Sequence, residues 1–232
     1  MILKNNRYTK MQKKFFDNIS ENIGKTNHRE HDANLDYEEI LLSDIKNFDN
    51  KIGLDFGCGA GRNVDNCLNL ANWKRFDGVD ISPKLIEKCY INLAKTNHDE
   101  NKYKFYVNNG IDLSVLKSDE YDFVMSTIVL QHICVYDIRY SLIEDIYRIL
   151  KKNGLFSFQM GYGHKKGMPT VDYYANNYDA ISTNSGCDTR VEMEDQIIND
   201  LKKIGFINIE TIIRSSYSNY NHDEWIYVKC YK

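Results

Sequence analysis

Residues 51–62, with the sequence KIGLDFGCGAGR, join a short apolar stretch to three closely spaced glycines and the start of a helical pattern. The apolar stretch 51–56 predicts a strand, and the one-sided apolar pattern of residues 62–71 predicts a helix. A chain that turns sharply from strand to helix needs glycine where it bends and where a ligand approaches bare backbone. Since the N–H groups of the first helical turn are free and lie at the positive end of the helix dipole, the stretch predicts a cofactor site.

An acidic residue completes this pattern, because Asp80 ends the next predicted strand, 76–79, nineteen residues after Gly61. Ligands of open parallel sheets bind beyond the carboxyl ends of the strands, where a carboxylate can accept hydrogen bonds from both ribose hydroxyls. The loop and the acid together predict an adenosine-containing cofactor. Arg62 stands where the dinucleotide fingerprint GxGxxG has its last glycine, which disfavours a nicotinamide dehydrogenase. Asp55, inside the loop, suits a ligand with an ammonium group.

The rest of the chain alternates predicted strands and helices. Strands are predicted at 51–56, 76–79, 103–107, 121–127, 155–160, 206–213 and 224–231, and helices at 62–71, after Ser82-Pro83, at 137–151 and at 192–204. This order predicts one α/β domain over residues 1–232, with an open, mostly parallel, seven-stranded Rossmann-like sheet, helices on both faces and an antiparallel terminal strand pair. Residues 1–48 are polar, with short helices expected around 11–19 and 37–45. Residues 161–190 form a long irregular insert, and such inserts are usually functional.

Composition excludes several function classes. The net charge of -3 argues against a protein that holds long nucleic acid by charge alone. The six cysteines form no CxxC pair, which favours buried free thiols in a reducing compartment. We find no signal peptide and no stretch apolar enough to cross a membrane, so a cytoplasmic protein is expected. His28 and His31 lack a third ligand, and no metal site is expected.

The ordered motifs resemble those of class I S-adenosylmethionine-dependent methyltransferases, specifically the small-molecule methyltransferase-domain families. The matching segments are 54–62, 78–82, 109–113, 121–126, 130–133 and 150–156. Many members carry Asp where Asn109 stands, but an amide oxygen can still accept from the adenine amino group. The resemblance implies S-adenosylmethionine as cofactor and S-adenosylhomocysteine as product.

The resemblance also implies roles for individual residues. Asp55 holds the methionine ammonium, through water, and Asp80 binds the ribose. The remaining cofactor contacts are backbone groups of Gly57, Cys58 and Gly59, packing of Ile81 on adenine, Asn109 and Gly110 at the adenine edge, and Ser126 and Thr127 below the methionine part. In the resembling families the N-terminal segment, here 1–48, closes over the cofactor, and the insert, here 161–190, builds substrate walls.

On the acceptor side, His132 follows the fourth strand and is the candidate general base, with a loop-orienting histidine as the alternative. Tyr8 in the lid and Tyr162, His164 and Arg190 in or beside the insert are candidate substrate-binding residues, although tyrosines are abundant in this chain. Aromatic rings suit the neighbourhood of a sulfonium, and Arg190 could clamp an acidic group.

These residues support methyl transfer to a small polar metabolite or a sugar-like acceptor as the first hypothesis. Transfer to protein or RNA is the second, and a non-catalytic cofactor-binding subunit is the third. The near-neutral charge and the lack of a basic arm argue against RNA. Residues 126–129 read Ser-Thr-Ile-Val where methyltransferases of nucleobases and glutamine amides carry Asn/Asp-Pro-Pro-aromatic. No acceptor, oligomeric state or methylated atom follows from the sequence.

Overall fold

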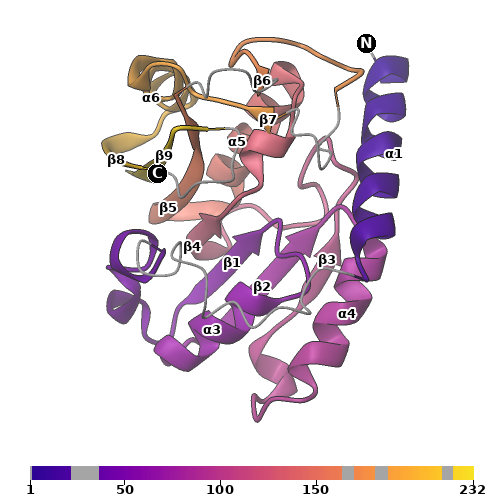
Figure 1. Cartoon of the computed structure of the whole chain (residues 1–232). Coiled ribbons are helices and arrows are strands. Elements are labelled where there is room, and N and C mark those ends of the chain that lie inside the picture. Colours follow the sequence, from indigo (N-terminus) through magenta and orange to yellow (C-terminus); the bar gives the residue numbers. More distant parts are fainter. Residues whose placement is uncertain (1, 22–36, 164–169, 181–187, 216–221) are drawn as a thin grey trace.

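The computed structural model describes residues 2–21, 37–163, 170–180, 188–215 and 222–232. A seven-stranded sheet with the order β3-β2-β1-β4-β5-β9-β8 forms its centre (Figure 1). The strands are β1 Ile52–Phe56, β2 Arg75–Asp80, β3 Phe105–Val107, β4 Tyr121–Ser126, β5 Leu150–Tyr162, β8 Ile207–Ser215 and β9 Glu224–Tyr231. The strands β1 to β5 pair in parallel, and β9 runs antiparallel to both β5 and β8. The predicted mixed sheet with its antiparallel terminal pair is confirmed.

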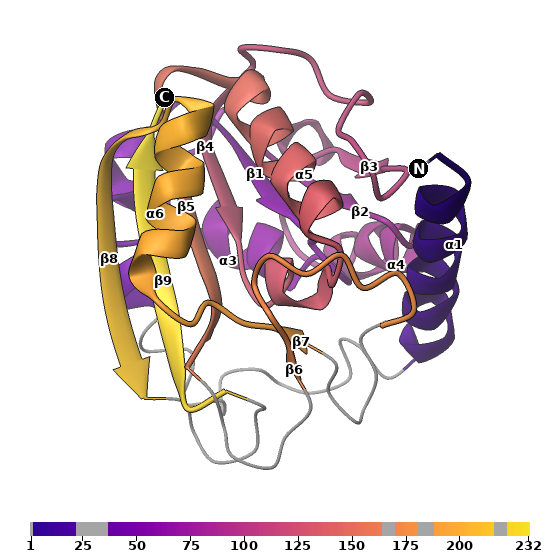
Figure 2. The ribbon, with the colours of Figure 1, turned by 90° about the horizontal axis from the view of Figure 1, so that it is seen from above.

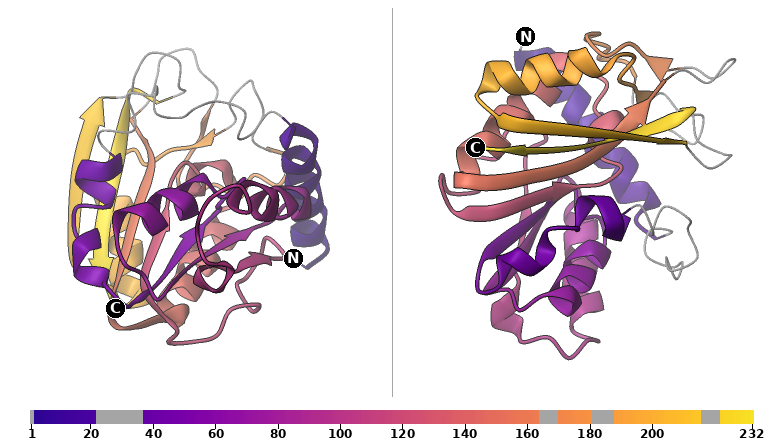
Figure 3. Two further views of the ribbon diagram at one scale, coloured as in Figure 1. Left: turned by 90° about the horizontal axis from the view of Figure 1, so that it is seen from below. Right: turned by 90° about the vertical axis from the view of Figure 1, so that its left-hand side faces the viewer.

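Helices cover both faces of this sheet, as Figures 2 and 3 show. They are α3 Arg62–Leu70 and α4 Pro83–Leu93 on one face, and α5 Tyr136–Ile149 and α6 Glu194–Ile204 on the other. Shorter helical turns are η2 Tyr37–Leu41, η3 Ile45–Phe48, η4 Glu100–Lys102 and η5 Leu130–His132, and two short strands, β6 Thr170–Val171 and β7 Asp188–Thr189, pair separately. No helix of the described residues is long and apolar enough to cross a bilayer.

Each face of the sheet has its own apolar core. On the α5 side, Ile138, Leu142 and Ile146 follow helical spacing and are at most 1% exposed. On the α3 side, Val64 and Trp73 are buried to the same extent. Each such side chain stabilises the fold by about 1.5–3 kcal/mol relative to an exposed one, so the one-sided patterns of the sequence determine where the helices pack. The five described cysteines are buried thiols outside disulfides, as expected.

The predicted helix ends are also confirmed. Ser82 caps α4, because its Oγ accepts a hydrogen bond from the N–H of Leu85 at 3.2 Å, and Pro83 occupies the first helical position. Gly205 ends α6 with φ of 118°, a left-handed conformation that glycine adopts without steric cost. These ends fix where the chain enters and leaves the sheet.

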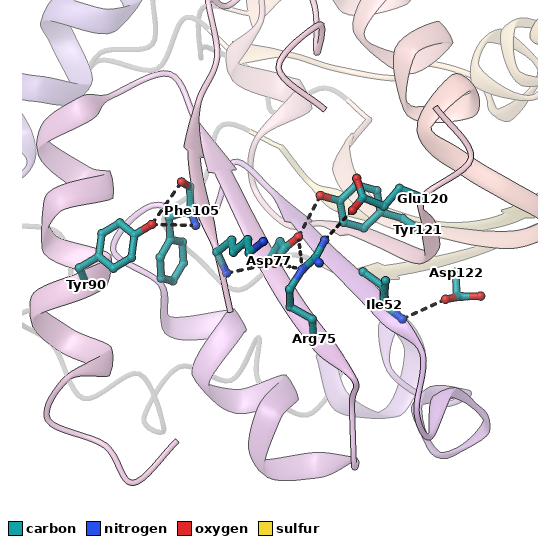
Figure 4. A network of polar contacts seen from close by, with 9 residues as sticks. Ile52, Arg75, Asp77, Tyr90, Phe105, Glu120, Tyr121 and Asp122 are labelled. Atoms are coloured by element: carbon teal, nitrogen blue, oxygen red, sulfur yellow. Dashed lines mark hydrogen bonds and ion pairs between the residues drawn. The ribbon is translucent and has the colours of Figure 1, made fainter. Parts of the chain in front are cut away.

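A buried ionic network lies in the amino-terminal half of β2, away from the glycine loop (Figure 4). The Nε of Arg75 donates to both carboxylate oxygens of Asp77, at 2.8 and 2.9 Å, and its Nη2 donates to Glu120 at 2.8 Å. Asp77 also accepts from the Tyr121 hydroxyl and from the N–H of Lys104, both at 3.0 Å. Burial raises the pKa of Asp77 to about 6 despite the guanidinium beside it. The network joins β2, β4 and the residue before β3.

The N-terminal segment is more helical than its polar sequence indicates. A single helix, α1 Ile2–Ile19, replaces the short helix expected at 11–19. The buried side chains of α1, Tyr8, Thr9 and Gln12, face the body of the domain, so tertiary contacts extend the helix beyond its amphipathic pattern. Figures 1 and 2 show α1 beside α4, at the side of the domain where the edge strand β3 lies.

Candidate cofactor and acceptor site

The glycine loop leaves β1 at its carboxyl end. Gly57, Gly59 and Gly61 have positive φ angles of 77°, 54° and 87°. Two features exclude a side chain at Gly57. One is its positive φ, and the other is that an added Cβ would lie 2.2 Å from Cγ2 of Val129 in the loop after β4. The loop therefore presents a surface free of side chains at the carboxyl edge of the sheet.

Most N–H groups of this loop have partners within the protein. Those of Gly57 and Cys58 donate to the Val79 carbonyl at 2.8 and 3.1 Å, and that of Gly59 donates to Oδ2 of Asp80 at 3.0 Å. The loop is thus fastened to β2, and what it offers a cofactor is mainly its shape. The Cys58 thiol lies 3.9 Å from the sulfur of Cys89, and burial raises its pKa, which makes it an unreactive thiol.

Asp80 is held at the end of β2 by two backbone groups. Its Oδ1 accepts a hydrogen bond from the N–H of Ser82 at 2.8 Å, and its Oδ2 accepts the one from Gly59. Burial raises the pKa of Asp80 to about 6, although these hydrogen bonds favour the charged form. Ile81 follows, and its Cδ1 would lie 2.5 Å from a Cβ added to Gly110. The predicted ribose and adenine residues Asp80, Ile81 and Gly110 therefore lie close together.

Asp55, near the end of β1, is fully buried, and neither of its carboxylate oxygens has a hydrogen-bond partner in the described part of the chain. Burial raises its pKa to about 7, and the positive charge of Arg62 and the nearby Asn63 side chain only partly oppose this rise. A buried carboxylate without partners is costly, so the site needs donors from a ligand. The ammonium group of a methionine moiety fits this requirement.

The end of β4 closes the floor of the site. The Ser126 hydroxyl donates to the Phe56 carbonyl at 3.0 Å, and Oγ1 of Thr127 accepts from the side-chain amide of Asn63 on α3 at 3.0 Å. Both predicted floor residues therefore use their hydroxyls to join β4 to β1 and α3. Their contribution to a cofactor site is to hold this floor in place.

The segment after β3 differs in detail from the expectation. The side-chain oxygen of Asn109 accepts from the N–H groups of Ile111 and Asp112 at 2.7 and 2.9 Å, so this amide closes its own turn. The neighbouring Asn108 has a buried side-chain oxygen with no partner among the described residues. We had not singled out Asn108, and the only sequence signal for it is its place beside Asn109 in the motif.

His132, the candidate base, lies in η5 and is contacted by α1. Its carbonyl accepts from Nε2 of Gln12 at 2.8 Å, and its ring lies 6.2 Å from that of Phe16. The Tyr8 hydroxyl accepts from Gln12 at 2.7 Å and from the N–H of Cys134 at 2.8 Å. Tyr8 is only 2% exposed, so its hydroxyl holds this loop. The i, i+4 spacing of Tyr8, Gln12 and Phe16 is the sequence signal that we missed.

The other end of α1 contacts α4. Asp17 is hydrogen-bonded to the Ser82 hydroxyl at 2.5 Å, and the Lys88 ammonium donates to the Ser20 carbonyl. Cγ2 of Thr9, the neighbour of Tyr8, lies 3.2 Å from a Cβ added to Gly110. The helix thus contacts α4, the predicted adenine segment and the His132 loop, and its role as a lid stays a prediction.

The three substrate-binding candidates in or beside the insert differ in their surroundings. The Arg190 guanidinium is 10% exposed and donates to Glu192 at 2.8 Å, with Asp172 at 3.5 Å and the Thr170 hydroxyl as further partners. These contacts neutralise the charge with which Arg190 was expected to clamp a substrate. Tyr162 lies half-buried at the end of β5, and His164 falls outside the described residues.

No group of three or more His, Cys, Asp or Glu side chains in the described segments could hold a metal ion. His28 and His31, the pair weighed as ligands, fall outside the described residues.

Residues 54–158 match a family model described as a methyltransferase domain. The chain is similar in fold to an S-adenosylmethionine-dependent methyltransferase of Mesorhizobium loti, with a TM-score of 0.60, 16% identity, and coverage of 83% of this chain and 95% of that one. It is similar to phosphoethanolamine N-methyltransferase 2 of Haemonchus contortus in complex with phosphomonomethylethanolamine and S-adenosylhomocysteine, with a TM-score of 0.59, 17% identity, and coverage of 85% and 56%. The cyclase SpnF also shares the fold, with a TM-score of 0.61 and 14% identity over 86% of this chain and 78% of that one. No curated protein matches the chain by sequence.

Proposed function

Since the chain contains a class I S-adenosylmethionine-dependent methyltransferase domain, we propose that it transfers the methyl group to a small polar metabolite or a sugar-like acceptor. The observation that carries this proposal is Asp55, whose buried carboxylate has no partner in the described residues and which is separated from the glycine-rich loop by one residue. An ammonium would supply the hydrogen-bond donors that Asp55 lacks, and ribose hydroxyls would add donors at Asp80, whose carboxylate already accepts from Gly59 and Ser82.

Fixed residues bring the reacting groups together. The cofactor supplies an electrophilic methyl group on a sulfonium, and the products are the methylated acceptor and S-adenosylhomocysteine. Asp55 and Asp80 hold the two ends of the cofactor, while α1 covers the site and restricts access of water. Alignment of the nucleophile in such a covered site contributes most of the acceleration in reactions of this kind. In this proposal the His132 ring takes the nucleophile's proton.

The position of α1 favours a small acceptor over protein or RNA. The helix is fastened at His132 and at Ser82, which supports a cover over the site between these two points. The Haemonchus contortus protein, solved with a small amine-bearing metabolite, is consistent with such an acceptor. No observation on this chain specifically favours the macromolecular acceptor or the non-catalytic subunit, and both remain outcomes of the experiment.

The experiment has a binding arm and a transfer arm. By calorimetry, S-adenosylhomocysteine should bind the protein and lose at least about tenfold in affinity in the Asp80→Ala variant. Asp77→Ala is the matched control, because Asp77 lies on the same strand but outside the site.

Incubation with S-adenosylmethionine labelled in its methyl group and a metabolite extract should label small molecules. Label only in macromolecules would support the second acceptor class, and binding without transfer would support a non-catalytic subunit. Tight binding of NAD without binding of S-adenosylhomocysteine would contradict the cofactor assignment.

A further inference from the structure

Two buried glutamines beside His132 each have an unused oxygen. Gln12 and Gln131 are 5% and 1% exposed, and Oε1 of each has no hydrogen-bond partner among the described residues. The orientation of Gln12 is fixed, because its Nε2 donates to the carbonyl of His132, which can only accept. Its Oε1 therefore faces away from that bond and needs a donor from elsewhere.

A third oxygen of this kind is Oδ1 of Asn5, two turns before Gln12 on α1, which is also buried without a partner in the described chain. All three unpartnered atoms are acceptors. Buried acceptors are almost always hydrogen-bonded in folded proteins, so the oxygens of Gln12 and Gln131, which contact or adjoin His132, favour a ligand group rich in N–H donors.

We infer that the methyl acceptor presents an amine nitrogen to Gln12 and Gln131, an inference that rests on the proposed transfer to a small molecule. An ammonium brings up to three donors and no lone pair, as a lysine side chain does. A hydroxyl brings one donor, and its lone pairs would face the remaining oxygens. A carboxylate brings none.

Aromatic side chains lie beside Gln12. The Tyr8 hydroxyl accepts from Gln12, and the Tyr8 ring meets that of Tyr178 edge to face with centroids 6.3 Å apart. Two guanidinium groups in this part of the domain have partners within the protein. Arg139 donates to the Ile133 carbonyl at 2.6 Å, and Arg190 pairs with Glu192.

The bound amine must lose a proton before it reacts, and the His132 ring or solvent takes that proton. The nitrogen lone pair then forms a bond to the methyl carbon while the carbon–sulfur bond breaks. The electron pair of the broken bond stays on sulfur, which becomes the neutral thioether of S-adenosylhomocysteine. The acceptor gains one methyl group on nitrogen, and no oxidant or further reactant is needed.

The first test uses methyl-labelled S-adenosylmethionine and a metabolite extract, either untreated or treated in water with an N-hydroxysuccinimide acetate ester, which acetylates amines. We expect the labelled small molecule to disappear after this treatment and its label to reside in an N-methyl group. Label that survives amine acetylation, or an O-, S- or C-methyl product, would overturn the amine while leaving the small-molecule transfer intact. If no small molecule is labelled in the untreated extract, the proposed function fails first, and the amine falls with it.

The second test compares two buried glutamines. Gln131→Met removes an unused oxygen, whereas Gln196→Met removes an oxygen that accepts from the N–H groups of Glu192 and Met193 at 2.8 and 3.2 Å. We expect Gln131→Met to keep or raise the unfolding temperature and to lower the labelling rate at low acceptor concentration by about tenfold. Gln196→Met should lower the unfolding temperature and leave the rate per folded molecule unchanged. An unchanged labelling rate in Gln131→Met would mean that its oxygen binds only water, and the inference would fail.

Discussion

Cofactor affinity should depend on pH through Asp55. Burial raises the pKa of this carboxyl to about 7 in the free protein, whereas an ammonium beside it would keep it charged in the complex. Below pH 7, binding must therefore displace a proton, and affinity falls with pH. If the pKa in the complex lies below 5, the dissociation constant for S-adenosylhomocysteine at pH 5.5 should exceed that at pH 7.5 by about 25-fold from Asp55 alone. Asp80, whose pKa is raised to about 6, adds a smaller factor of the same sign.

Isothermal calorimetry in buffers of different ionisation enthalpy measures this linkage directly. At pH 7 the wild-type protein should release about half a proton per bound ligand. Asp55→Asn should bind more weakly at pH 7.5, release almost no proton, and keep only the pH dependence that Asp80 contributes. A wild-type affinity as independent of pH as that of the variant would refute the reasoning, because Asp55 would then not change its ionisation on binding.

Three further substitutions test the parts that hold the site. Gly57→Ala combines a positive φ with a Cβ 2.2 Å from Val129, so thermal unfolding should show a loss of roughly 3 kcal/mol together with weaker cofactor binding. Asp77→Ala leaves Arg75 without its main partner and should lower the free energy of unfolding by about 3 kcal/mol in urea, while each folded molecule binds S-adenosylhomocysteine normally. Tyr8→Phe leaves a buried N–H without an acceptor and should cost about 2 kcal/mol; unchanged hydrogen exchange in α1 would contradict its role there.

The sequence predicted the sheet well because its determinants are local. Apolar runs at β4 and β9 mark buried strands, and the Ser82-Pro83 pair and Gly205 mark helix ends through their own backbone chemistry. The length of α1 was underestimated, because its stability comes from contacts with residues about 120 positions away, such as that of Gln12 with His132. A polar glutamine at that position carries no such signal in a single sequence.

The cofactor site was predictable to the level of the loop, and less so to the level of atoms. Glycine spacing and Asp80 indicated which residues gather at the carboxyl edge. Which polar atoms can still bind a ligand depends on neighbours in space. The side-chain oxygen of Asn109 accepts a hydrogen bond within its own turn, whereas that of Asn108 has no partner in the described chain. Likewise, the sequence does not indicate that Arg190 forms ion pairs with Glu192 and Asp172, which reduce its availability for a substrate.

The loop after His132 connects the cover of the site to its chemistry. Three separate segments fasten this loop: Gln12 and Tyr8 from α1, the Asn177 N–H on the Cys134 carbonyl, and the buried Arg139 guanidinium on the Ile133 carbonyl. The same guanidinium donates to the carbonyl of Tyr173 in the insert. Because α1 and the insert hold different groups of the same loop, displacing either one removes hydrogen bonds that fix this loop for the other. The two covers should therefore open and close as one unit, and His132 should be in position only when both are closed.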